Sequence, residues 1–209
     1  MSKKILSFVM ATAMIFSLVG CGQKQEAVTY EINHVVGEKE EPAGLLTGKY
    51  AVRIEVENFG DIFVELDADA APISVTNFMK LVHEEYYTGL TFHRIIEGFM
   101  MQGGQSKEKP AANIKGEFAA NGIDNPISHE RGVISMARAN DPNSASSQFF
   151  ICHQDSFFLD GQYAAFGHVV SGMDVVDKIC EEAVVVDDNG TVPAEYQPVI
   201  KGIYDVTGE

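Results

Sequence analysis

Three segments of the chain concentrate the side chains that could do chemistry. The first, residues 92–104, holds Arg94 and Gln102 beside the apolar pair Phe99 and Met100. The second and third, residues 132–151 and 158–167, combine aromatic residues with small ones. An arginine stays charged at any working pH and offers donors in a fixed geometry. Beside an apolar pocket, such a group can stabilise a polar transition state without any nucleophile.

Other chemistries find no support in the spacing of the reactive residues. No two histidines stand four residues apart, and no HExxH pattern occurs, so no metal or cofactor is expected. Ser144, Ser146 and Ser147 precede His153 and Asp155, which could suggest a hydrolase. The chain has no G-x-S-x-G elbow, however, and this stretch is typical of a turn.

The three segments together resemble the cyclophilin-type peptidyl-prolyl cis–trans isomerases. The first reads FHRIIEGFMMQGG, the second runs from GVISMAR to SSQFFI, and the third reads FLDGQY with FG shortly after it. The resemblance covers residues 49–206 in the family's order. It implies a mainly β fold, a closed eight-stranded antiparallel β-barrel capped by two α-helices. It also implies an enzyme that accelerates cis–trans isomerisation of X–Pro bonds.

The resemblance further implies which residues line the proline-binding face. Catalytic roles fall to Arg94, Phe99 and Gln102. The other substrate-binding residues are implied to be His93, Met100, Ala137, Arg138, Phe149, Phe150, Phe158, Leu159 and Tyr163. Phe158 stands where the best-known members often have tryptophan, and Tyr163 where they often have histidine. Because an indole N–H donor is missing, we expect cyclosporin to bind weakly.

The chemistry of an X–Pro bond agrees with these residue types. Rotation about the amide destroys its C–N resonance and meets a barrier of about 18–20 kcal/mol. No covalent bond breaks. The barrier is therefore lowered by an apolar pocket that excludes water from the proline ring and by a hydrogen-bond donor to the twisted amide. We assign apolar contact to the aromatic and aliphatic residues and the substrate carbonyl to the amide of Gln102. The guanidinium of Arg94 is assigned to the prolyl nitrogen, whose lone pair localises as resonance is lost.

Hydrophobic periodicity predicts the strands that position these residues. Residues 50–57 alternate apolar and charged side chains, and residues 61–66 return after a turn as the hairpin partner. Further short strands are predicted at 91–95, 99–102, 133–138, 148–152, 164–169 and 199–206. Eight such strands can close into a barrel filled by side chains.

Two helices and one long loop complete the predicted elements. A helix opens near Pro72, with Ser74 as its N-cap, and ends near Glu84. A second short helix is predicted over residues 173–180. Residues 103–132 hold several glycines and prolines but no periodic element, and a loop of this length is usually functional or mobile. Strands and helices do not alternate, which disfavours a doubly wound sheet.

Composition narrows the choice of partners. The chain is 45% hydrophobic and 22% charged, as expected for one globular domain with appendages. Its formal net charge is −15, and a chain this acidic is a poor candidate for binding nucleic acid. The expected partners are proline-containing polypeptides, such as unfolded or exported proteins, and the expected oligomeric state is a monomer.

The first twenty residues predict an export signal. Lys3 and Lys4 precede a mostly apolar run over residues 5–20, which is too short to cross a bilayer. The run ends in LVGC, which resembles the lipobox of bacterial lipoproteins and makes Cys21 the acylated N-terminus. Residues 21–48 then read as a flexible tether and residues 49–209 as the isomerase domain. The expected location is outside the cytoplasm, lipid-anchored to the bacterial cell membrane.

Several alternatives stay open on sequence alone. Residues 1–20 could form an ordinary signal peptide in which Cys21 has no role. Cys152 and Cys180 could be buried free thiols or form a disulfide. Taken singly, each apolar site residue could simply fill the core. The second interpretation of the function is a non-catalytic, chaperone-like module at the cell surface that binds proline-containing segments.

Overall fold

A computed structural model describes residues 44–208. The predicted export signal, Cys21 and most of the predicted tether lie outside these residues. Within residues 44–208, no helix is both long and apolar enough to cross a membrane.

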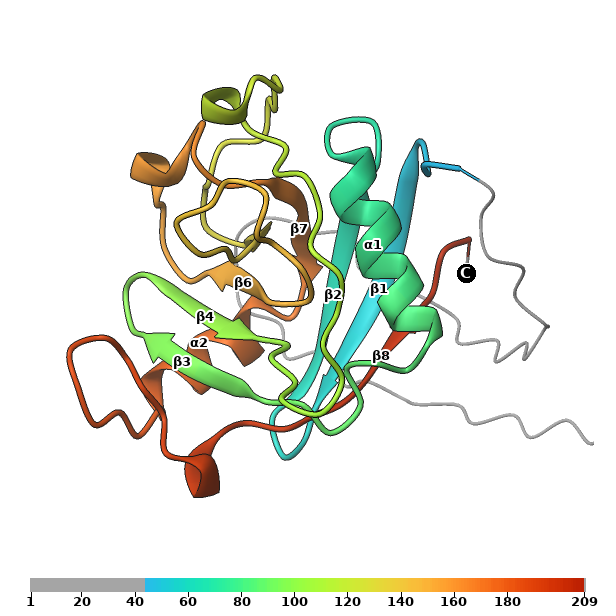
Figure 1. Cartoon of the computed structure of the whole chain (residues 1–209). Helices are drawn as coiled ribbons and strands as arrows, with labels where there is room; N and C mark the ends of the chain where they lie inside the picture. Colours follow the sequence, from blue (N-terminus) through green and yellow to red (C-terminus); the bar gives the residue numbers. More distant parts are fainter. Residues whose placement is uncertain (1–43, 209) are drawn as a thin grey trace, which may run out of the picture. The chain divides into compact units, whose positions relative to one another are not determined.

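Eight strands form one antiparallel sheet within the described residues (Figure 1). The strands are β1 (Lys49–Val56), β2 (Gly60–Asp67), β3 (Phe92–Ile96), β4 (Met100–Gly103), β5 (Val133–Met136), β6 (Phe149–Cys152), β7 (Ala165–Ser171) and β8 (Ile200–Asp205). Their order across the sheet is β3-β4-β6-β5-β7-β2-β1-β8. The helices are α1 (Pro72–His83) and α2 (Met173–Glu181), with short 3-10 turns η1 (Ala119–Asn121), η2 (Phe157–Leu159) and η3 (Ala194–Tyr196). The predicted eight strands and two helices are confirmed.

The prediction of a closed barrel is wrong, because the sheet is an open half-barrel. Strands β3 and β8 lie at its two edges and do not pair with each other. A single bridge joins Thr91 to Val199, just before each edge strand begins. The outer edge of β3 is instead covered by the chain after α2, where Thr191 bridges to Arg94. A covered edge no longer offers free backbone groups to another strand, so closure of the sheet is not needed.

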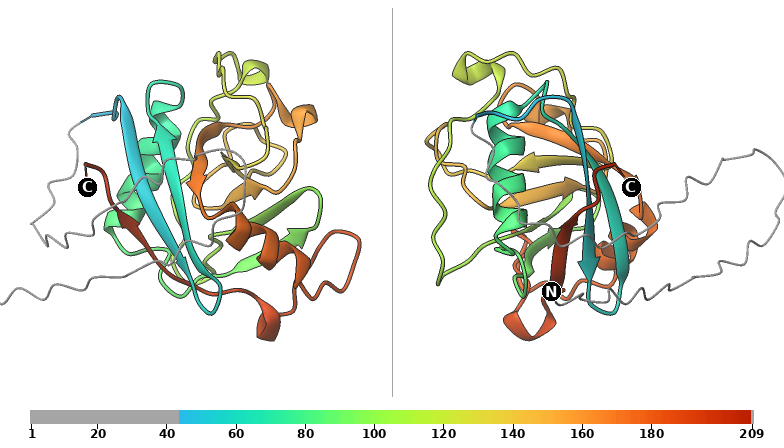
Figure 2. Two further views of the ribbon diagram at one scale, coloured as in Figure 1. Left: turned by 180° about the vertical axis from the view of Figure 1, so that it is seen from behind. Right: turned by 90° about the vertical axis from the view of Figure 1, so that its right-hand side faces the viewer.

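The main core lies between the sheet and its two helices. Alternate residues of β1 and β2, such as Ile54 and Ile62, are fully buried, as the period-two pattern predicts. Helix α1 packs against β2 and β8, and α2 packs against β2 and β4 (Figure 2). The ring of Phe78 on α1 lies 5.5 Å from that of Phe149 and 5.2 Å from that of Phe166. This aromatic cluster fixes α1 on the sheet.

The N-terminus of α1 is capped differently from the prediction. The N-cap is Ala71, and Ser74 lies inside the helix, where it makes no capping bond of its own. The carboxylate of buried Glu117, from the long 103–132 loop, accepts bonds from the backbone N–H of Ile73 (2.9 Å) and of Ser74 (2.7 Å). It also accepts a bond from the Ser74 hydroxyl at 2.7 Å. The long loop therefore supplies the cap that satisfies the first turn of the helix.

The two cysteines of the described chain are free and buried. Burial raises the pKa of both thiols, Cys152 and Cys180, to about 12. Since only the thiolate reacts with disulfide reagents, we expect no labelling of the folded protein at about pH 8. Labelling of both should become fast in denaturant. Rapid labelling of the native protein would contradict the buried positions.

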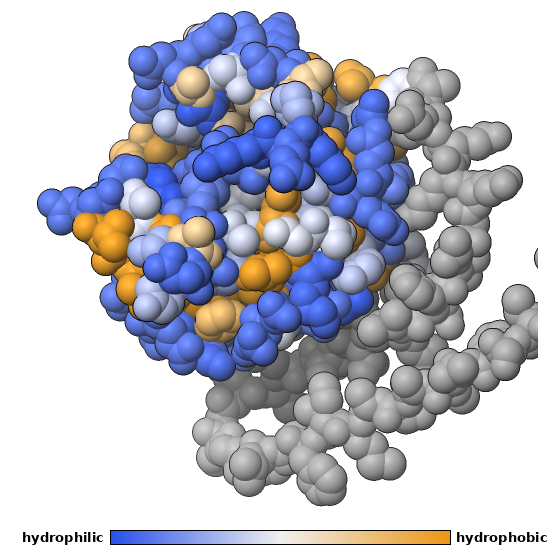
Figure 3. Space-filling view, turned by 60° about the horizontal axis from the view of Figure 1, so that its bottom comes forward, coloured by the Kyte–Doolittle hydropathy of each residue, from blue (hydrophilic) through white to orange (hydrophobic). Residues whose placement is uncertain are grey.

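Apolar surface is discontinuous on the face of the molecule that Figure 3 shows, where it forms separate patches between hydrophilic areas. The exposed large apolar side chains are Leu45, Phe157, Phe158, Val170, Val184, Val185, Val186 and Tyr196. Phe157 and Phe158 stand out, because both lie on η2 and that turn borders the cavity described next.

Candidate active site

The β3–β4 hairpin places two polar side chains on one face. Arg94 pairs with Gln102 across the hairpin, so their side chains point the same way. Gly98 in the turn adopts φ of 77°, a left-handed conformation that suits glycine. The turn closes with the N–H of Phe99 donating to the carbonyl of Ile96 at 3.0 Å. Phe99 is therefore the last residue of the turn and directly precedes β4.

The neighbouring strands carry a second, smaller core. Both faces of β4, β5 and β6 are covered, so consecutive residues enter different cores. Met100, Val133 and Phe150 belong to the smaller core, together with Leu159 at the end of η2. Phe149 belongs to the main core instead. The smaller core ends at a surface cavity.

This cavity has a volume of about 290 Å³. It is lined by Arg94, Phe99, Met100, Gln102, Ala137, Arg138, Phe150, Phe158, Leu159 and Tyr163. The ring of Phe99 lies 5.4 Å from that of Phe158, and the ring of Phe150 lies 6.0 Å from that of Tyr163. The cavity thus brings together a cation, an amide and several apolar side chains from parts of the chain far apart in sequence.

Two predicted substrate-binding residues, His93 and Phe149, do not line the cavity. Phe149 is fully buried and packs on Phe78, because it faces the opposite side of β6 from Phe150. His93 occupies the irregular position of β3, where the register shifts between Phe92 and Arg94. Burial lowers the pKa of the His93 imidazole. The structure thus does not bring His93 and Phe149 to the wall of this cavity, where ten of the other predicted site residues meet.

The guanidinium of Arg94 is held in a fixed direction by its neighbours. Its Nε donates to the carbonyl of Asn189 at 2.8 Å, and Nη1 donates to Oε1 of Gln102 at 3.3 Å. Nη1 also approaches Sδ of Met100 at 3.7 Å. Burial lowers the pKa of Arg94, but arginine stays charged near neutral pH. Nη2 has no hydrogen-bond partner among residues 44–208, so it can donate to a ligand in the cavity.

Two residues that the sequence analysis missed support this arrangement. Oε1 of Gln148 accepts a bond from Nε2 of Gln102 at 2.9 Å, which fixes the direction of that amide. Asn189 contributes through its backbone carbonyl. A backbone carbonyl has no sequence signature, whereas Gln148 lay inside the second segment and was visible as a polar residue in a β-prone run.

The loop that carries Asn189 is seated on β3 through Gly190. The N–H of Ile95 donates to the carbonyl of Gly190 at 2.8 Å. Gly190 has φ of 77°, and a Cβ there would approach the carbonyl oxygen of Ile95 to 2.3 Å. No side chain can occupy that space without moving the loop.

Replacing Gly190 with alanine is therefore expected to lower kcat/KM by about tenfold, through displacement of the Asn189 carbonyl from Arg94. Gly122→Ala is the matched control, because Gly122 has φ of 76° but a Cβ there would meet no atom within 4 Å. Both variants carry the same backbone strain. Steady-state kinetics on a proline-containing peptide should distinguish the two variants. Equal activities would show that the loop does not determine the position of the Arg94 guanidinium.

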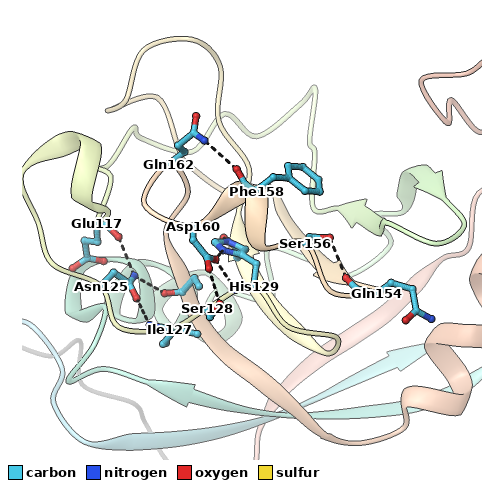
Figure 4. Close-up of polar contacts among 12 residues, drawn as sticks. Glu117, Asn125, Ile127, Ser128, His129, Gln154, Ser156, Phe158, Asp160 and Gln162 are labelled. Carbon is cyan, nitrogen blue, oxygen red and sulfur yellow. Dashed lines mark hydrogen bonds and ion pairs between the residues drawn. The ribbon is translucent and has the colours of Figure 1, made fainter.

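A chain of polar contacts that begins at exposed Asp160 and ends at buried Ser135 supports the η2 turn (Figure 4). Asp160 accepts bonds from the Ser128 hydroxyl (2.6 Å) and from the backbone N–H of His129 (2.8 Å), and its carboxylate lies 2.8 Å from Nδ1 of His129. The imidazole stacks on Phe150 at 6.0 Å, and its Nε2 lies 3.0 Å from the Ser135 hydroxyl. Burial lowers the pKa of His129, which favours the neutral ring.

The order Asp160, His129, Ser135 has the form of a hydrolytic triad but not its accessibility. Ser135 and His129 are both buried, with 0% and 1% of their surface exposed. A substrate carbonyl could not reach the serine oxygen, and a triad needs an accessible nucleophile. These three residues instead position the ring of Phe150 and the turn that carries Phe158 and Leu159.

Comparison with known proteins gives one consistent result. The family model described as cyclophilin type peptidyl-prolyl cis-trans isomerase/CLD matches residues 51–203. A peptidyl-prolyl cis-trans isomerase of Acinetobacter baylyi is 47% identical over 150 residues, covering 65% of this chain and 77% of that protein. Peptidyl-prolyl cis-trans isomerase B of Escherichia coli is 41% identical over 130 residues, covering 58% and 79%.

Solved structures agree with this relationship. A cyclophilin type peptidyl-prolyl cis-trans isomerase of Cryptosporidium parvum superposes with a TM-score of 0.65 at 28% identity, covering 76% of this chain and 98% of that one. A structure of that protein in the presence of the dipeptide Ala-Pro gives a TM-score of 0.64 at 29% identity, covering 74% and 98%.

Proposed function

The chain belongs to the cyclophilin-type peptidyl-prolyl cis–trans isomerases, and we propose that its 290 Å³ cavity is the site where it catalyses the isomerisation of X–Pro bonds. Isomerase activity follows from relatives of more than 40% identity. The observation that carries the location is the meeting of the Arg94 guanidinium with Phe99 and Phe150 around one cavity.

The apolar side of the cavity accepts the proline ring. Phe99, Met100, Phe150 and Leu159 provide its walls, and Phe158 extends them to the surface. Burying the ring there excludes water from the amide and strengthens every electrostatic contact made with it. The Ala-Pro dipeptide used with the Cryptosporidium protein has the same chemistry as the ligand proposed for this chain.

The polar side of the cavity acts on the amide. The Gln102 amide, oriented by Gln148, binds a substrate carbonyl. As the X–Pro bond twists, the nitrogen lone pair localises and becomes a better acceptor. A donor from Arg94 strengthens at that moment, so it binds the transition state more tightly than either planar isomer. Because rotation breaks no covalent bond, the reaction requires no nucleophile.

The cellular role is proposed from the N-terminal sequence. With LVG before an acylated Cys21, the domain would act outside the cytoplasm, anchored to the cell membrane, as a monomer on exported proteins. Proline isomerisation takes tens of seconds unaided, which is slow enough to limit folding. Mass spectrometry of membrane-fraction protein should find a lipid on Cys21. An unmodified mature protein in the medium would refute the anchor.

The test of the isomerase proposal uses a model protein whose refolding is limited by proline. Adding the purified full-length chain in catalytic amounts should accelerate the slow phase and leave the fast phase unchanged. If the chain binds proline-containing peptides but accelerates nothing, it is a binding module of the chaperone-like kind. Cyclosporin should inhibit only at high concentration, because Phe158 offers no indole N–H.

A further inference from the structure

A second, polar groove lies against the turn that precedes Phe99. Its volume is about 400 Å³, and it is lined by Glu97, Gly98, Arg131, His153, Gln154, Asp177 and Glu181. None of these residues lines the proline cavity. The His153 side chain in this groove is well enclosed, with 8% of its surface exposed. The groove therefore contains a buried imidazole that the proposed mechanism does not use.

Both ring nitrogens of His153 have defined partners. The backbone N–H of Gly98 donates to Nδ1 at 2.9 Å, and Nε2 lies 3.1 Å from Oδ1 of Asp177. A backbone N–H can only donate, so Nδ1 carries the lone pair and Nε2 carries the proton. The ring is thus a neutral imidazole of one tautomer. His153 also donates its own backbone N–H to the carbonyl of Phe99 at 2.8 Å.

The far end of the ring lies against Asp177 of helix α2. The hydrogen bond from Arg131 lowers the pKa of Asp177, which keeps that carboxylate ionised. Arg131 contacts both oxygens of Asp177 at 2.8 Å. Its Nη1 also donates to the carbonyl of His153 at 2.6 Å. A continuous chain therefore runs from Arg131 through Asp177 and His153 to the N–H of Gly98.

We propose that His153 is a positioning residue for the isomerase reaction, holding the Gly98 turn through Nδ1 so that Phe99 stays at the wall of the proline cavity. This inference rests on the proposed function of that cavity. Phe99 follows Gly98 directly, and its backbone carbonyl is bound by the same histidine. Two bonds from one residue thus hold the turn at the point where it delivers the Phe99 ring.

A matched pair of variants isolates the acceptor at Nδ1. In His153→Asn the side-chain oxygen can take the place of Nδ1, whereas His153→Leu has similar size and no acceptor. Both lose the contact with Asp177 equally. We expect kcat/KM of the full-length chain on an X–Pro peptide to fall about tenfold in His153→Leu and to stay within about twofold of wild type in His153→Asn. Equal losses in the two variants would overturn the proposal.

A spectroscopic measurement tests the hydrogen bond itself, and the other amide resonances report whether the leucine variant is folded. The amide proton resonance of Gly98 should lie downfield in wild type and in His153→Asn, because a hydrogen bond holds it, and should move upfield in His153→Leu. A Gly98 resonance at the same position in all three proteins would refute the bond to the side chain at position 153. If wild type showed no isomerase activity at all, the proposed function would fail, and the Gly98 resonance would still decide the role of His153 in the turn.

Discussion

Replacing Arg94 with alanine is expected to lower kcat/KM on an X–Pro peptide by about a hundredfold or more. Removing one preorganised donor to a developing charge typically lowers the rate by about 10²–10³. The donor acts mainly on the twisted amide, so the loss should fall on kcat while KM changes little. A protease-coupled peptide assay, or exchange spectroscopy at equilibrium, measures both.

Arg138 supplies the matched control for Arg94. It lines the same cavity, but its guanidinium lies 4.6 Å above the ring of Tyr163 and donates to the carbonyl of Gln162 at 3.0 Å. Its donors are thus directed at its own neighbourhood, and Arg138→Ala should lose less than about tenfold. Similar losses in the two variants would mean that only the positive potential of the cavity matters. Full activity of Arg94→Ala would refute the assignment of Arg94.

The strands and helices could be predicted because their burial alternates. In β1 and β2 one face is buried and the other is partly exposed, and the charged residues between Val52 and Val56 lie on the partly exposed face. The site residues were found through sequence motifs rather than through periodicity. Phe149 and Phe150 are both buried, so no pattern in the sequence tells which of them faces the cavity.

What could not be predicted depends on contacts between distant segments. The outer edge of β3 is covered by the segment around Thr191, nearly a hundred residues further along the chain. The hydrogen bond that orients the Arg94 guanidinium is accepted by a backbone carbonyl, which any residue can supply. The helix cap comes from Glu117, which lies 43 positions after Ser74, whereas capping rules search only the neighbouring residues.

The cap from Glu117 predicts a large effect on stability. In Glu117→Ala, the backbone N–H groups of Ile73 and Ser74 and the Ser74 hydroxyl all lose their acceptor. These donors lie in a buried site, since Ser74 is 0% and Glu117 1% exposed. Water cannot replace the carboxylate there, so the free energy of unfolding should fall by about 3 kcal/mol. Urea denaturation followed by circular dichroism measures this loss.

Glu130 provides the comparison, because it lies in the same long loop but is exposed. Glu130→Ala should change the unfolding free energy by less than about 0.5 kcal/mol. Glu117→Gln should fall between the two, since one oxygen remains to accept while the new NH₂ group faces donors. If Glu117→Ala were as stable as Glu130→Ala, the first turn of α1 would have to obtain its acceptors elsewhere. The 103–132 loop would then not be what anchors that helix beside the sheet.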